Sequence, residues 1–133
     1  MIYLLGFGSN IDPQHHFARA TEQLQTIAQV VAQSPALTTD TVGDTFHFPF
    51  MNQLVIIETD LIANLLKLQL QRIEQQLGRE PKNPARKQKD RTIDIDILFQ
   101  GNSIEACLKA PLEDSYNQQI QAAWLQQLST AEG

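Results

Sequence analysis

The segment TIDIDILF, residues 92–99, restricts the fold of this chain more than any other part of the sequence. Its isoleucines, Ile93, Ile95 and Ile97, alternate strictly with two aspartates, Asp94 and Asp96. Successive side chains of a β-strand point to opposite faces of the sheet. A strand here therefore buries its isoleucines in a core and presents both carboxylates together on the other face.

The remaining segments predict further strands and amphipathic helices. Apolar residues at helical spacing predict a helix over about residues 13–32, with Asp12 as its N-cap. A second helix follows Asp60, which we expect to cap it, and it ends at Gly78. Strands are expected over residues 2–8, 34–41 and 51–59, and a C-terminal helix over residues 116–128.

The order of these elements identifies the fold class. Strand, helix, strand, strand, helix, strand is the ferredoxin-like βαββαβ pattern, an α+β fold whose antiparallel sheet carries both helices on one face. We expect a short C-terminal extension after it and a second sheet face that is free for a site. A length of 133 residues suits one domain spanning residues 1–133.

Positive charge is concentrated in residues 79–91. This window holds six of the ten lysines and arginines against two carboxylates, a net charge of +4, so the formal total of -5 leaves -9 on the other 120 residues. An acidic remainder would repel a long polyphosphate, which favours a small, highly charged anion over nucleic acid as the partner. The window contains two prolines and no apolar periodicity, which predicts a loop. Such a loop can act as a lid whose cations face phosphates. A solvated run of charge is the alternative.

Nothing in the sequence indicates a membrane or secreted protein. No apolar run approaches the roughly 18 residues that a membrane span needs, and the N-terminus lacks the basic region of a secretion signal. One cysteine, Cys107, cannot form an internal disulfide. We therefore expect a cytoplasmic protein.

Asp94 and Asp96 are the strongest candidates for a metal site. Their Cα atoms are expected about 6 to 7 Å apart on one face of the strand. Hard divalent ions such as Mg²⁺ accept one or two carboxylates and complete their coordination with water and phosphate oxygens. Two solvated aspartates on an exposed strand face are the alternative. The cationic window directly before this strand favours the metal site.

Phe50 and Asn52 are candidates for binding an aromatic ligand. They lie two residues apart, so a strand places them on the same face. The ring offers a flat wall, and the carboxamide offers a donor and an acceptor to the edge of a heterocycle. Core packing is the alternative for the phenylalanine.

Taken together, these motifs resemble those of the 6-hydroxymethyl-7,8-dihydropterin pyrophosphokinase family of folate biosynthesis. The resemblance covers roughly the first 105 residues, and its most specific part is the block R-T-x-D-x-D-I-L. The segments that carry it are Gly8-Ser9-Asn10, Phe50-Met51-Asn52, Gln71-Arg72-Ile73-Glu74, Gly78-Arg79 and the block from Arg91 to Leu98.

The resemblance implies transfer of pyrophosphate from ATP to the hydroxymethyl oxygen of the pterin, with release of AMP, by a monomeric enzyme. Asp94 and Asp96 would hold two Mg²⁺ ions, and Arg79 and Arg91 would act with them on the phosphates. The pterin would contact Thr39, Val42, Phe50 and Asn52, and the nucleotide would contact Gln71, Glu74, Lys82, Arg86 and Ile97.

The sequence departs from this family in several places, one of which is Thr39-Asp40-Thr41-Val42-Gly43, where the family has T-P-P-L-G. Gln88-Lys89-Asp90-Arg91 stands where the family has W-G-P-R. Pro81 replaces a second arginine, for which Lys82 or Arg86 can compensate. Leu112 follows Pro111 where the family has histidine. These departures leave two further hypotheses open. One is a divergent paralogue that binds a nucleotide or pterin-like ligand with weak or no turnover. The other is a ferredoxin-like interaction module for an RNA-like partner, which the acidic remainder disfavours.

Overall fold

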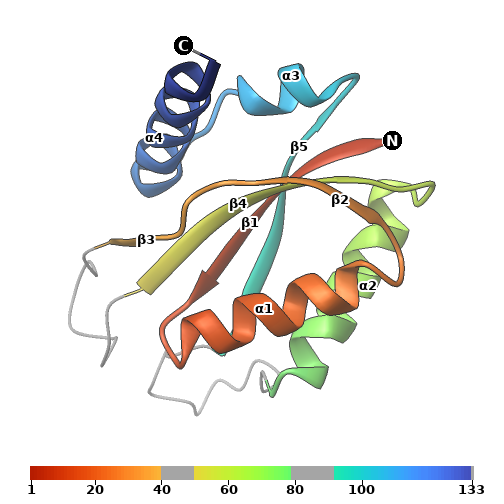
Figure 1. Cartoon of the computed structure of the whole chain (residues 1–133). Coiled ribbons are helices and arrows are strands. Elements are labelled where there is room, and N and C mark those ends of the chain that lie inside the picture. The colour runs from red at the N-terminus through yellow and green to blue at the C-terminus, as the bar shows by residue number, and fades with distance from the viewer. Residues whose placement is uncertain (40–49, 79–91, 133) are drawn as a thin grey trace.

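The computed structural model describes residues 1–39, 50–78 and 92–132 (Figure 1). Each predicted class of element is present in it. The elements are β1 (Ile2–Ser9), α1 (Pro13–Leu24), β2 (Gln29–Gln33), β3 (Leu37–Thr39), β4 (Phe50–Glu58), α2 (Ala63–Gln76), β5 (Asp94–Gly101), α3 (Ile104–Leu108) and α4 (Ser115–Glu132). No helix among these residues is long and apolar enough to cross a bilayer.

The sheet confirms the predicted ferredoxin-like topology. Its strand order is β2-β4-β1-β5, β3 pairs with β4 beside this path, and every pairing is antiparallel. The central strand β1 places Gly8 opposite Asn52 of β4 on one side and opposite Asp94 of β5 on the other. Residues from the two halves of the chain therefore meet in one row across the sheet.

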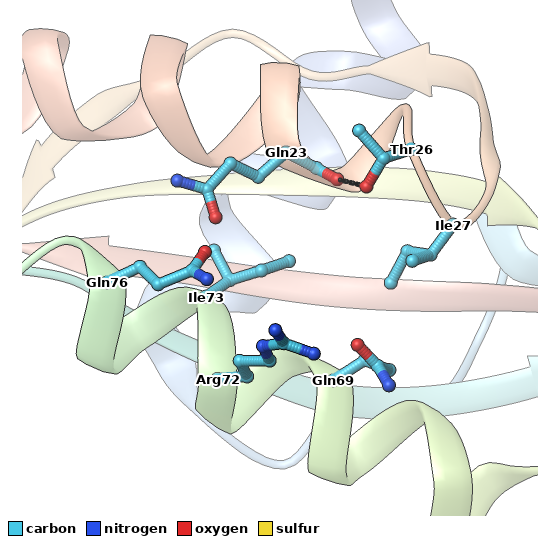
Figure 2. Close-up of a pocket in the computed structure, with 7 residues that line it drawn as sticks. All are labelled: Gln23, Thr26, Ile27, Gln69, Arg72, Ile73 and Gln76. Carbon is cyan, nitrogen blue, oxygen red and sulfur yellow. Dashed lines mark hydrogen bonds between the residues drawn. The ribbon is translucent and has the colours of Figure 1, made fainter.

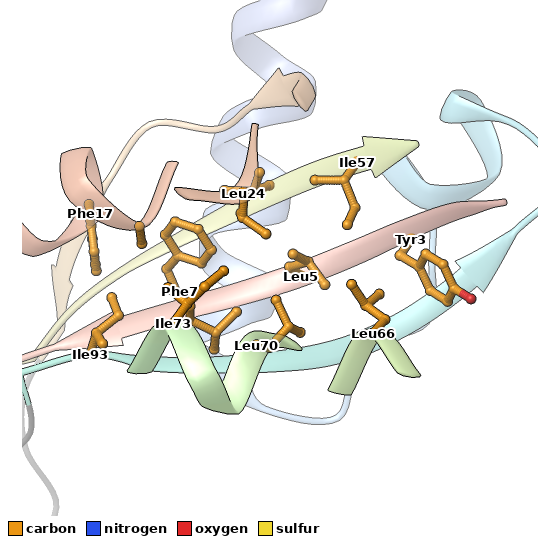
Figure 3. Close-up of a cluster of buried hydrophobic side chains, with 13 residues drawn as sticks. Tyr3, Leu5, Phe7, Phe17, Leu24, Ile57, Leu66, Leu70, Ile73 and Ile93 are labelled. Atoms are coloured by element: carbon orange, nitrogen blue, oxygen red, sulfur yellow. The ribbon is translucent and has the colours of Figure 1, made fainter. Parts of the chain in front are cut away.

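Helices α1 and α2 cover one face of the sheet and enclose the larger core (Figure 1). Strand β1 contributes its odd-numbered side chains, Tyr3, Leu5 and Phe7, each at most 1% exposed. Figure 3 shows them packed against leucines and isoleucines of both helices and against Ile93, which directly precedes β5. Each fully buried side chain of this size stabilises the fold by about 1.5 to 3 kcal/mol. The alternation of residues 92–99 joins this core as predicted, because Ile93 and Ile95 are both buried in it.

The opposite face of the sheet is not free, which corrects the sequence prediction. Helices α3 and α4 pack on it, and Trp124 and Ile120 of α4 contact a second apolar cluster that includes Leu4, Leu54 and Ile56 (Figure 1). Strands β1 and β4 are apolar at consecutive positions, the pattern of strands buried on both faces. The C-terminal extension therefore covers part of this face of the sheet.

The first predicted helix is too long. Helix α1 ends at Leu24, and residues 29–33 form β2, which pairs with β4. Ile27 and Ala28 contact the core that the helical spacing predicted for this segment, whereas Val31, which that spacing placed on the same face, packs against the second apolar cluster on the other face of the sheet. The periodicity was therefore only partly correct, because the β-branched pair Val30-Val31 and the pairing with β4 favour a strand.

The strand predicted over residues 34–41 is also shorter in the described residues, where β3 covers only Leu37–Thr39. Ser34 instead bridges toward β4: its backbone N–H donates to the carbonyl of Leu54, and its hydroxyl accepts from the N–H of Leu54, both at 2.8 Å. Pro35 follows directly and has no N–H with which to continue a ladder.

The helix ends differ partly from the predicted caps. Asp12 precedes α1 as expected, but it has left-handed backbone angles, φ 46° and ψ 56°, and its side chain makes no cap hydrogen bond. Helix α2 begins after Ile62 rather than after Asp60, again without a side-chain cap. Gly78 follows the end of α2 with φ 96°, a conformation that glycine adopts without strain.

Candidate active site

The floor of the candidate site is formed by two glycines of β1. Gly8 lies between Asn52 and Asp94 in the sheet, and Gly6 lies opposite Asp96. Because the odd-numbered residues of β1 face the helices, these even-numbered positions face the other side, and they carry no side chain there. Two strand spacings of about 4.8 Å separate β4 from β5 across β1. The Asn52 amide leans over Gly8 and the Leu98 side chain lies over Gly6, so the hollow between them is small.

Asp94 and Asp96 form one wall of this hollow. Both line it, on the face opposite to Ile93 and Ile95, as the alternation predicted. Asp94 is half-buried and Asp96 is exposed. Nearby polar partners exist for both carboxylates. The pair is therefore accessible from solvent and held in place by the edge strand β5.

Asn52 and Phe50 stand on the other wall. The Asn52 side chain is 8% exposed, and a Cβ atom built on Gly8 would lie 3.1 Å from its Oδ1 and 3.9 Å from Cδ1 of Phe50. The predicted adjacency of these two residues is therefore confirmed. Gly8 is the residue that lets the Asn52 amide approach the strand so closely.

The third wall comes from the start of α4. Asp114, Tyr116 and Asn117 line the same hollow as Asp94 and Asp96. The Tyr116 hydroxyl donates a hydrogen bond to Oδ2 of Asp114 at 3.1 Å. Burial, followed by this hydrogen bond and the charges of Asp114, Asp96 and Asp94, raises the pKa of Tyr116 to about 12. The tyrosine thus remains a neutral donor beside three carboxylates.

Sequence reasoning missed five residues of this site. Gly8 was predicted only as part of Gly8-Ser9-Asn10, a segment that carries the resemblance, and Gly6 had no predicted role. Their signal was the alternation Gly6-Phe7-Gly8 itself, since a buried phenylalanine fixes both glycines on the opposite face. Asp114, Tyr116 and Asn117 had only a weak signal, an aspartate before a predicted helix. Their place in the site depends on how α4 packs across the sheet.

Of the residues that the resemblance assigned to the nucleotide, Gln71 and Glu74 lie on α2 and Ile97 lies on β5. Gln71 is exposed on α2, and Ile97 is partly buried against the larger core. Glu74 is 6% exposed, and its Oε2 accepts a hydrogen bond of 2.8 Å from the backbone N–H of Ile95. Glu74 therefore also fastens α2 to the edge strand, a structural task that the sequence did not reveal.

The remaining predicted site residues lie outside the described structure, wholly or in part. Val42 belongs to residues 40–49, and the four basic residues Arg79, Lys82, Arg86 and Arg91 belong to residues 79–91. Thr39 is described by its backbone alone, as the last residue of β3. The predicted cationic lid lies in these residues and stays a prediction.

The donor set of the hollow suits a hard divalent cation. Its lining in the described residues offers carboxylate and carboxamide oxygens, the ligands that Mg²⁺ accepts, and no thiol or imidazole. Within the described ranges, no three His, Cys, Asp or Glu side chains are close enough to hold one ion together. A cation here would therefore rest on the pair Asp94 and Asp96, with water or a ligand in the remaining positions.

A larger hollow of about 340 Å³ lies on the far side of the molecule, between α1 and α2 (Figure 2). Its lining consists mainly of amides and one guanidinium, from Gln23, Gln69, Gln76 and Arg72. Among the described residues, its lining has no carboxylate to bind a metal, and the sheet separates it from Asp94 and Asp96. Size alone therefore does not identify the active site.

The fold and this site define a class of protein: a ferredoxin-like α+β protein whose paired strand carboxylates would suit a divalent cation of the kind used in phosphoryl transfer. Comparison with known proteins agrees with this class. The family model described as 7,8-dihydro-6-hydroxymethylpterin-pyrophosphokinase matches residues 4–129.

Individual relatives point to the same family. The 2-amino-4-hydroxy-6-hydroxymethyldihydropteridine pyrophosphokinase of Porphyromonas gingivalis is 34% identical over 100 residues, which are 74% of this chain and 68% of that protein. A folate synthesis bifunctional protein of Chlamydia muridarum is 30% identical over 110 residues, 77% of this chain and 24% of that protein.

The chain therefore belongs to the 7,8-dihydro-6-hydroxymethylpterin-pyrophosphokinase family. This membership confirms the resemblance read from the sequence, and it makes the chain an ATP-dependent pyrophosphokinase of folate biosynthesis. Kinases generally require Mg²⁺.

Proposed function

We propose that this chain transfers the pyrophosphoryl group of ATP to the hydroxymethyl oxygen of 6-hydroxymethyl-7,8-dihydropterin, with two Mg²⁺ ions held by Asp94 and Asp96. One observation carries the proposal. The Asp94 and Asp96 carboxylates face the Asn52 amide across a floor of two glycines, so one hollow offers both a metal site and a heterocycle site.

The reaction forms one bond and breaks one. The hydroxymethyl oxygen attacks the β-phosphorus of ATP, the bond between that phosphorus and the oxygen bridging to the α-phosphorus breaks, and AMP leaves. The hydroxyl proton passes to solvent. Bound Mg²⁺ offsets the charge on the phosphates. No nucleophilic side chain is required, so the protein acts by positioning and by electrostatics.

Different side chains bind the pterin and the phosphates. Asn52 hydrogen-bonds the edge of the pterin, Phe50 stacks on its face, and the backbone near Thr39 and Val42 contacts it further. The pair Asp94 and Asp96 would hold the Mg²⁺ ions that bind the phosphates. Gln71, Glu74 and Ile97 lie near the nucleotide, and Lys82 and Arg86 bind its phosphates. Arg79 and Arg91 stabilise the transferred group. We further propose that the enzyme works as a monomeric, single-domain protein.

The test is release of AMP from ATP in the presence of Mg²⁺ and the pterin. We expect Asp96→Ala to lower the rate by at least about 100-fold, the usual cost of removing a group that stabilises a transition state. Asp60→Asn is a matched control, because Asp60 is an exposed aspartate that follows β4 at the far end of the sheet. Equal AMP release by the wild-type protein and Asp96→Ala would refute the metal role of the pair. Calorimetric binding of ATP and pterin without AMP release would instead identify a non-catalytic paralogue.

A further inference from the structure

Glu74 is a carboxylate buried in the apolar layer between α2 and the sheet. It is 6% exposed, and the other buried residues of α2, Leu66, Leu70 and Ile73, are all apolar members of the larger core. Burying a carboxylate is costly, and an apolar side chain of similar volume in such a place is often neutral or better for stability. The position therefore points to a task that a packing side chain cannot perform.

The contact of Glu74 with β5 shows what this task is. Its Oε2 accepts from the backbone N–H of Ile95 at 2.8 Å, across 21 positions of the chain. Ile95 stands between Asp94 and Asp96, and its N–H belongs to the peptide group that joins it to Asp94. The peptide group is planar, so holding it restricts the backbone dihedrals on either side of it. Glu74 thus acts on the backbone from which both carboxylates project.

The segment that carries this pair is short and lies at an edge. Strand β5 begins at Asp94, and its first register with β1 runs only to Ile97, because Leu98 is an extra residue before pairing resumes at Phe99. Such bulges bend a strand and interrupt its ladder. In the described sheet path, β1 is the strand next to β5 and no strand lies on the other side. The hydrogen bond from α2 is therefore a second hold on this segment.

We propose that Glu74 is a positioning residue for the metal pair: its bond to the N–H of Ile95 sets the directions in which the Asp94 and Asp96 carboxylates leave the strand. The inference rests on the metal role proposed above for this pair. It differs from a nucleotide contact of Glu74, because the effect passes through the backbone of β5. Side chains that orient metal ligands typically lower metal affinity or activity by roughly 10- to 100-fold when they are removed.

Two substitutions separate positioning from packing. Glu74→Leu fills the buried space and removes the acceptor, whereas Glu74→Gln keeps a side-chain oxygen that can accept from Ile95. Glu74→Met is a second apolar variant, since its flexible side chain fits irregular core space. We expect both apolar variants to bind Mn²⁺ at least about 10-fold more weakly than the wild-type protein, and Glu74→Gln to bind it nearly as tightly.

Calorimetric titration with Mn²⁺, in the presence of a non-hydrolysable ATP analogue, measures this affinity without turnover. The Mg²⁺ concentration for half-maximal AMP release at saturating ATP is the kinetic counterpart and should rise by a similar factor. Hydrogen exchange of the Ile95 amide reports the bond itself. It should be faster in Glu74→Leu and remain slow in Glu74→Gln.

Leu70→Ala is the matched control for damage to the core. Leu70 is 1% exposed, belongs to the same core and lies one turn before Glu74 on α2. Its truncation should lower the temperature of thermal unfolding and leave Mn²⁺ affinity unchanged, measured well below that temperature. An equal loss of Mn²⁺ affinity in Leu70→Ala and Glu74→Leu would overturn the positioning role, because any loosening of the core would then weaken the site.

Asp96→Ala separates this inference from the proposed function. Loss of Mn²⁺ binding in Asp96→Ala with weakened binding in Glu74→Leu would support both. Loss in Asp96→Ala with wild-type affinity in Glu74→Leu would overturn the role of Glu74 alone. Wild-type affinity in Asp96→Ala would overturn the metal role of the pair and the inference with it. A higher KM for ATP in Glu74→Leu at an unchanged metal requirement would assign Glu74 to the nucleotide and overturn the positioning role.

Discussion

Substitution of Gly8 by alanine should separate ligand binding from stability. The new Cβ atom would lie 3.1 Å from Oδ1 of Asn52, closer than ordinary van der Waals contact, so the amide must move by a few tenths of an ångström. Asn52 is 8% exposed and has little room to do so. The perturbation thus acts on the group that is proposed to read the edge of the pterin.

The substitution should change the free energy of unfolding and the free energy of pterin binding by separate amounts. Overpacking costs about 1 to 3 kcal/mol, while replacing glycine by alanine in a strand recovers about 0.4 to 1 kcal/mol through the unfolded chain. The net loss of stability is therefore about 1 kcal/mol. A displaced amide loses one or two hydrogen bonds to the pterin, about 0.5 to 1.5 kcal/mol each, so pterin affinity should fall about tenfold.

Calorimetry with the pterin in the presence of a non-hydrolysable ATP analogue measures the affinity, and urea unfolding measures the stability. Gly101→Ala is the reciprocal control. Its Cβ would lie 3.1 Å from both Sγ of Cys107 and Cε2 of Phe99, at the opposite end of β5, so it should lower stability and leave pterin affinity unchanged. Wild-type pterin affinity in Gly8→Ala would refute the placement of the pterin beside Asn52.

Two further predictions concern α4. Trp124 packs against the sheet and is 3% exposed, so Trp124→Ala should lower the free energy of unfolding by about 3 to 5 kcal/mol. Leu128 on the same helix is exposed, so Leu128→Ala should change the free energy of unfolding by less than about 1 kcal/mol. Similar losses from both substitutions in urea unfolding would contradict the packing of α4. Tyr116 should titrate at about 12 instead of 10.0, because burial and the neighbouring carboxylates disfavour the phenolate. Since its pKa is raised on folding, its contribution to stability is complete below about pH 10 and is lost as the pH rises toward 12. Alkaline titration of tyrosinate absorbance, with Tyr116→Phe to assign the signal, checks this, and a Tyr116 transition near pH 10 would contradict it.

The sequence predicted most reliably what is decided locally. The alternation of residues 92–99 requires nothing beyond strand geometry, so both the strand and the shared face of Asp94 and Asp96 were predictable. Residues 27–31 show the limit of this reasoning. Their apolar spacing fits a helix as well as a strand, and only pairing with β4, more than 20 residues away in the chain, selects the strand.

The site was predictable only where its residues carry recognisable chemistry. Carboxylates and an amide attract notice in a sequence, but Gly8 becomes part of the site only through its register with Asn52 and Asp94. Asp114 and Tyr116 enter it because α4 crosses the sheet. This placement depends on apolar contacts of Trp124 that no local pattern specifies.

The hydrogen bond between Glu74 and Ile95 affects the tendency of this protein to aggregate through its edge strand. Strand β5 is at the end of the described sheet path, so its outward N–H groups face no further strand. Exposed edge strands that are rich in isoleucine are templates for pairing with another chain, a common route to aggregation. By occupying the N–H of Ile95 with a buried carboxylate, α2 removes one of the donors that an incoming strand would need. The same contact that fastens helix to sheet thus helps to keep the edge beside Asp94 and Asp96 open to small ligands and closed to other protein strands.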